Sequence, residues 1–121
     1  MTVAVIAVIA VFFVGMGVYA LAAPAALIRP FGVTLDSPTS RSEVRAVYGG
    51  FGLAIAAVLG YAAFRGGGLQ KGILITVGIA LAGMALGRIV SAILDERTSF
   101  YPNWLYFIVE IVAAAALFAV A

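Results

Sequence analysis

The sequence predicts an all-α integral membrane protein, an up-down-up-down four-helix bundle. Of its 121 residues, 65% are hydrophobic and only 10% are charged, whereas a soluble domain carries about 25% charged residues to face water. Four apolar stretches are each long enough to cross a hydrocarbon core, which takes about 20 helical residues. Short loops separate these stretches, and short connections favour antiparallel neighbouring helices. We expect one transmembrane domain, residues 1–121.

The first expected helix covers residues 3–28, and no charge interrupts it from Val3 to Ala23. Ala20-Leu21-Ala22 resembles the small-residue site at which a secretory signal is cleaved. However, no Lys or Arg precedes the apolar run, and the run is longer than the signal core of about 7–15 residues. We therefore expect a spanning helix, which ends ahead of Arg29-Pro30.

The second expected helix covers residues 41–64. Ser40 followed by Glu43 fits a capping box, in which two side chains satisfy free amide groups at a helix start. Arg65 and three consecutive glycines end this helix, because glycine weakens helices and favours turns. The third and fourth helices are expected over residues 70–95 and 102–121. Pro102 lies near the first position of the last helix, where its missing N–H costs little.

Composition excludes several kinds of site. The chain has no cysteine and no histidine, so it lacks thiolate and imidazole metal ligands, and we expect neither a metal site nor a cofactor. Its net charge of +2 is scattered, so we expect no binding of nucleic acid.

The informative residues are the few charges inside the spans, because a charge in hydrocarbon is costly and faces a partner. Arg45 lies about 7 Å along the second helix, and Glu110 about 12 Å along the fourth, at about 1.5 Å per residue. Arg88 lies about 10 Å back from the end of the third helix. All three helix ends belong to the side of the first and third loops, so the three charges fall at similar depth.

Helical spacing adds neighbours to these charges. Residues three or four apart share a helix face, as do Arg88, Ser91 and Asp95 in the third helix. Asn103, either Tyr106 or Phe107, and Glu110 share a face of the fourth in the same way. The simplest arrangement has Glu110 accepting from Arg88, Arg45 or both, since a guanidinium can serve a carboxylate with two parallel bonds. The complete expected cluster is Arg45, Tyr48, Arg88, Ser91, Asp95 and Glu110.

This cluster has two interpretations. It is either a buried ion-pair network that fixes the helix register or the polar part of a ligand-binding cavity. Arg45, Arg88 and Glu110 sum to a charge of +1, which Asp95 or Glu43 at the rim neutralises unless an anion binds. A lipid phosphate or a small carboxylate would supply that anion.

Small residues recur at helix-packing spacing and suggest where partners contact the chain. Gly83 and Gly87 form a G-x-x-x-G pattern, and Gly49 and Gly52 line one side of the second helix. Close backbone approach through small residues drives helix association in lipid. These faces either pack the bundle internally or form a homo-oligomer or a larger membrane complex.

The sequence resembles a bacterial four-helix membrane family that is catalogued as a domain of unknown function. The matching segments are Arg45-Ala46-Val47-Tyr48-Gly49-Gly50, the Gly87-Arg88-Ile89 core and Val109-Glu110-Ile111. The resemblance implies a location in the bacterial inner membrane. It implies no activity, because the family has none established. Lys and Arg differ between the two sides by one or two residues, which leaves the orientation undetermined.

We expect a small binding or accessory protein whose polar cluster holds a lipid headgroup or a small anionic or amphipathic ligand, among membrane lipids. A structural subunit of a larger membrane complex is the main alternative, and a transporter or an enzyme acting on a lipophilic substrate is a weaker one. We expect no enzymatic activity and no catalytic residue, because Ser91 has no histidine to activate it and Glu110 is the only acid deep in a span.

Overall fold

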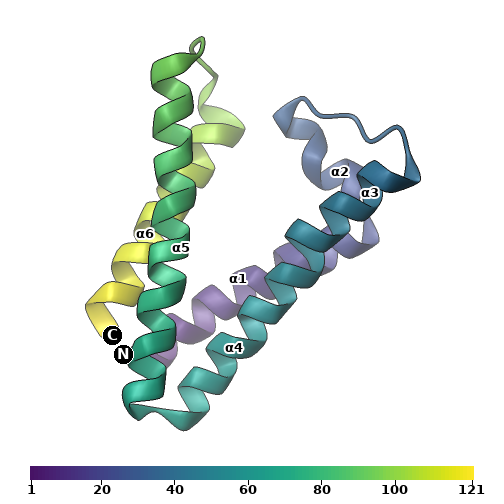
Figure 1. Ribbon diagram of the computed structural model, residues 1–121. Helices are drawn as coiled ribbons and strands as arrows, with labels where there is room; N and C mark the ends of the chain where they lie inside the picture. Colours follow the sequence, from purple (N-terminus) through teal and green to yellow (C-terminus); the bar gives the residue numbers. More distant parts are fainter.

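The computed structural model describes residues 1–121 and is helical throughout, without a strand (Figure 1). Four helical stretches are long and apolar enough to cross a membrane, which agrees with the predicted all-α class and with its four membrane-length helices. These stretches are Thr2–Ala22, Pro38–Arg65, Gly67–Leu94 and Phe100–Val120.

The first span is helix α1, Thr2–Ala22, and a separate short helix α2, Pro24–Ile28, follows it. The expected continuous helix 3–28 is thus interrupted at Ala23, whose φ of −141° and ψ of 65° are not helical. The cause is Pro24, because a proline ring disfavours the helical conformation of the residue before it. A single 3₁₀ turn, Arg29–Phe31, continues the chain into the first loop.

The second span begins earlier than expected. Helix α3 is Pro38–Val44, a π-helical segment Arg45–Gly50 follows, and helix α4 is Phe51–Arg65. The capping box expected from Ser40 and Glu43 is wrong. Ser37 is the cap residue, and its Oγ accepts from the N–H of Ser40 at 3.0 Å while the Oγ of Ser40 accepts from the N–H of Ser37 at 3.2 Å.

The third span, α5, is Gly67–Leu94 and follows a tight turn at Gly66 and Gly67, which both have positive φ. The fourth span begins with a kinked segment, Phe100–Trp104, and continues as α6, Leu105–Val120. The kink lies at Tyr101, whose φ/ψ are extended, directly before Pro102.

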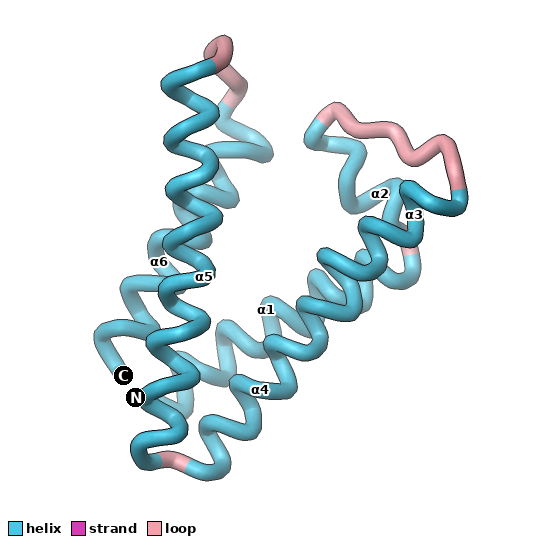
Figure 2. Tube along the Cα trace, in the orientation of Figure 1, coloured by secondary structure: helices cyan, strands magenta, loops and turns pink.

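The helices pair into two arms, α1 with α4 and α5 with α6, and each of these pairs is in extensive contact. Figure 1 and Figure 2 show the arms meeting near the two termini and the α4–α5 turn, and diverging toward the first and third loops. The main hydrophobic core lies where the arms meet, because it combines early residues of α1 and α5 with late residues of α4 and α6. Its members are Ile6, Ile9, Leu59, Leu74, Val77, Leu81, Ala114 and Leu117.

Glycines bring α1 and α4 together. A Cβ placed on Gly49 would lie 2.7 Å from Leu21 Cδ2, and one on Gly52 would lie 3.5 Å from the carbonyl oxygen of Phe13. The Gly49/Gly52 face therefore packs against α1 within the chain, which is the internal one of the two expected roles. By contrast, Gly83 and Gly87 on α5 have no neighbour within 4 Å of such a Cβ.

Candidate functional site

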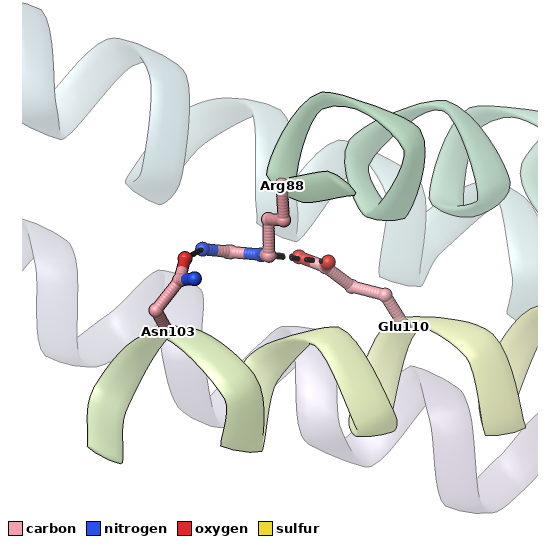
Figure 3. A network of polar contacts seen from close by, with 3 residues as sticks. All are labelled: Arg88, Asn103 and Glu110. Carbon is pink, nitrogen blue, oxygen red and sulfur yellow. Dashed lines mark hydrogen bonds and ion pairs between the residues drawn. The ribbon is translucent and has the colours of Figure 1, made fainter. Parts of the chain in front are cut away.

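A bidentate ion pair joins α5 to α6 (Figure 3). The Nε of Arg88 donates to Oε1 of Glu110 at 2.8 Å, and its Nη2 donates to Oε2 at 2.9 Å. This fork-to-fork geometry fixes the orientation of both groups as well as their separation, and charge-assisted bonds of this kind are about twice as strong as neutral ones.

Asn103 completes the network from the start of the fourth span. Its Oδ1 accepts from Nη1 of Arg88 at 3.0 Å, so the guanidinium is held between two polar side chains seven positions apart (Figure 3). Tyr106 lies between them along the helix, and the Cζ of Arg88 is 5.9 Å from the centre of its ring. Three helix-four residues on one face thus surround a single arginine.

The glutamate of the ion pair is buried, and the arginine is partly exposed. Glu110 is 4% exposed and is the only charged residue that is buried, while the side chain of Arg88 is 21% exposed. No buried side-chain nitrogen or oxygen lacks a hydrogen-bond partner. The charges of Arg88 and Glu110 cancel, so the network carries no net charge.

The ion pair lies in the wall of a large, partly open cavity between the two arms. The cavity has a volume of about 820 Å³, and 21 of its 24 lining residues are hydrophobic; ligand sites commonly measure about 300–1,000 Å³ and have the same apolar character. Arg88 and Glu110 are the charged residues that line it. The α1/α4 arm contributes residues such as Phe12 and Phe51, and the α5/α6 arm contributes Val109 and Ala113.

Two tyrosines add hydroxyl groups to this apolar wall. Tyr48 from the π-helical segment and Tyr106 from α6 both line the cavity. Phe31, which follows the first span, packs on Tyr106 with the ring centres 5.5 Å apart. This contact joins the two arms again at the first-loop end, so the cavity lies between the helix junction and the Phe31–Tyr106 pair.

Arg45 does not belong to the network, so of the two expected donors to Glu110 the structure shows Arg88 alone. Its Nε donates instead to the carbonyl oxygen of Leu21 at 3.0 Å, and it does not line the cavity. The reason lies in the break at Ala23, because the last carbonyl groups of a helix have no partner within it. Arg45 thus caps the end of α1.

Ser91 and Asp95 also lie apart from the ion pair. Ser91 lines a smaller pocket of about 230 Å³ near the third loop, and the Oδ1 of Asp95 accepts from the N–H of Glu96 at 2.9 Å. Of the six expected residues, the structure brings Tyr48, Arg88 and Glu110 to one cavity. The expected cluster did not include Asn103. Its position seven residues before Glu110, on the same helix face, was the signal that could have placed it there.

Comparison with known proteins gives a family and no activity. No curated protein and no solved structure matches the chain. A family model described as "Domain of unknown function (DUF4345)" matches residues 1–121, in line with the resemblance to a family of that kind. The chain therefore belongs to the DUF4345 family.

Proposed function

We propose that this protein binds an amphipathic ligand between its two arms, with the polar end of the ligand at Arg88. It does so as an up-down-up-down four-helix protein of the bacterial inner membrane. The observation that carries the proposal is the 820 Å³ apolar cavity with one buried ion pair in its wall. Arg88, Glu110 and Tyr48 are the proposed ligand contacts, and Asn103 positions Arg88.

The size of the cavity supports an occupant. The cavity is partly open rather than enclosed, and its apolar lining includes exposed side chains such as Phe51 at 58% and Val112 at 61%. Its volume of about 820 Å³ lies within the range of about 300–1,000 Å³ that is common for ligand sites. In a membrane, lipid chains or lipid-soluble molecules would contact these side chains, and we propose that the ligand comes from this supply.

Binding fits the site better than catalysis does. The cavity contains neither a nucleophile beside a base nor a pair of carboxylates, which are the groups that acid–base and covalent mechanisms require. The carboxylate of Glu110 is already occupied by Arg88 through both oxygens. We therefore propose a binding or accessory role without catalytic residues.

The test is saturable photolabelling of the detergent-solubilised protein. A 16-carbon fatty acid and its methyl ester, each with a diazirine in the chain, are crosslinked and the labelled residues are mapped by mass spectrometry. We expect at least one of them to label cavity residues such as Phe12 and Val109, and excess unlabelled compound to suppress that label. The proposal is refuted if neither compound labels the cavity residues, or if excess unlabelled compound leaves the label unchanged.

Two matched alanine variants sharpen this test. Ala113 lines the cavity and Ala115 is exposed on the outside of the same helix. Ala113→Phe should fill part of the cavity and lower the saturable label several-fold, whereas Ala115→Phe should leave it unchanged. Equal effects of the two variants would show that the label reports general contact with lipid.

A second candidate role is that of a structural subunit, and the open Gly83/Gly87 face of α5 favours it. Such a face allows close helix approach in lipid, either to a second copy or to another membrane protein. Native mass spectrometry of the wild type and of Gly83→Leu tests the homo-oligomer. A dimer that Gly83→Leu dissociates supports it, and a monomeric wild type contradicts it.

A further inference from the structure

We propose that the polar end of the cavity ligand is an uncharged hydrogen-bond acceptor, such as an ester or ketone carbonyl. This inference rests on the proposed function and specifies its ligand class. Three observations carry it: the charge balance of the site, its unused donors and its depth in the helices.

The charge balance disfavours an anion. With Arg45 bound to the α1 terminus, the charges that line the cavity are Arg88 and Glu110, which sum to zero. An anion bound here would leave water without a compensating positive charge, and burial of an uncompensated charge is among the costliest steps in apolar surroundings. A cation would face the same difficulty, because the carboxylate is already paired.

The hydrogen-bonding groups favour an acceptor. A guanidinium has five N–H donors, and Arg88 uses three of them, one from each nitrogen. One N–H on each Nη thus stays free, and the Tyr48 and Tyr106 hydroxyls at the cavity make no hydrogen bond within the chain. The guanidinium has no lone pair, so only an acceptor can complement its two free N–H groups, and the tyrosine hydroxyls can donate to the same kind of ligand oxygen.

The depth of Arg88 points the same way. Arg88 lies six residues before Leu94, the last residue of α5, which corresponds to about 9 Å along the helix. A strongly hydrated headgroup placed there would have to give up its water inside the span. A carbonyl group, which needs few hydrogen bonds, loses less on the same transfer.

The experiment compares 18-carbon compounds that differ at the head and share the chain length. Methyl oleate, oleate at pH 8, oleylamine and 1-octadecene compete against the diazirine methyl ester for the labelled cavity residues. We expect methyl oleate to compete at about one-tenth of the concentration that the other three require, since a good hydrogen bond contributes up to about tenfold in affinity. Stronger competition by oleate or oleylamine, or equal competition by 1-octadecene, overturns the inference.

Tyrosine variants test the donors without removing the ion pair. Tyr48→Phe combined with Tyr106→Phe should cut the advantage of methyl oleate over 1-octadecene about fivefold to tenfold. Tyr61→Phe is the control, because the Tyr61 hydroxyl bonds Arg65 outside the cavity, and it should preserve the advantage. An advantage that survives the double variant overturns the role of these hydroxyls.

The two proposals fail in different ways. If neither photoprobe gives saturable labelling of the cavity, the proposed function is refuted. If the cavity is labelled and competed but the charged compounds compete best, the cavity binds a ligand of another class, and only the uncharged-acceptor inference is refuted.

Discussion

Replacing Glu110 with glutamine tests how much the ion pair contributes to assembly of the helices. Glutamine has nearly the same shape but keeps one acceptor oxygen, so one of the two bonds from Arg88 is replaced by two N–H groups that face each other. It also leaves the guanidinium charge without its counter-ion in the span. Arg88 is then held by one bond to the glutamine oxygen and by its bond to Asn103 Oδ1 at 3.0 Å, both to uncharged acceptors.

The expected cost lies between two known limits. Exposed ion pairs contribute about 0–1 kcal/mol, whereas breaking a buried pair costs about 3–5 kcal/mol. The side chain of Glu110 is 6% exposed and that of Arg88 is 21% exposed. The cost should therefore lie near the buried limit, reduced somewhat because the guanidinium of Arg88 is partly exposed. We expect Glu110→Gln to lower the free energy of unfolding by about 2–4 kcal/mol.

The assay is reversible unfolding in mixed micelles of mild detergent and dodecyl sulfate, followed by Trp104 fluorescence and circular dichroism. Glu96→Gln is the matched control, because the side chain of Glu96 is exposed and makes no ion pair, and it should change stability by less than about 0.5 kcal/mol. A Glu110→Gln protein as stable as this control would refute the reasoning, because the pair would then be no more than a surface interaction.

Three further predictions concern the same assay. Asn103→Ala should cost about 0.5–1.5 kcal/mol, less than Glu110→Gln, because single polar contacts between membrane helices average about 0.6 kcal/mol; a larger loss than that of Glu110→Gln contradicts the ranking. Gly49→Ala should cost about 1–3 kcal/mol because its Cβ would meet Leu21 at 2.7 Å, whereas Gly50→Ala, with its nearest atom at 3.9 Å, should not destabilise; equal effects would contradict the packing described. Ser37→Ala should cost about 1 kcal/mol by removing the helix cap, and an unchanged free energy of unfolding would contradict that role.

Hydropathy predicted the all-α class and the four membrane-length helices because lipid leaves the backbone few choices. A segment in hydrocarbon must satisfy its own N–H and C=O groups, which a helix does, so four long apolar runs sufficed to indicate four spanning helices. Helix ends were harder to predict, because they depend on local competition. Two potential caps, Ser37 and Ser40, lie three residues apart, and the structure uses Ser37 as the cap and Ser40 as its reciprocal partner.

Depth along the helices correctly predicted the contact between Arg88 and Glu110, but it did not predict the position of Arg45. Arg88 and Glu110 lie on helices that pack along their length, so equal depth brought them within bonding distance. Arg45 lies at similar depth on the other arm, and the arms diverge toward this end (Figure 1). Equal depth therefore did not imply contact, and the divergence of the arms was not readable from hydropathy or spacing.

The position of Arg45 changes the chemistry that the site can support. Three charges with a sum of +1 would favour an anion, and the sequence left that option open. Once Arg45 is committed to the carbonyl of Leu21, the cavity wall is neutral but still rich in donors. The break at Ala23 leaves that carbonyl without a helical partner, so Pro24, which follows the first span, contributes to keeping the charge of Arg45 away from the cavity. A substitution of Pro24 that extends α1 through Ala23 would give the carbonyl of Leu21 a partner within the helix and so weaken the bond that holds Arg45.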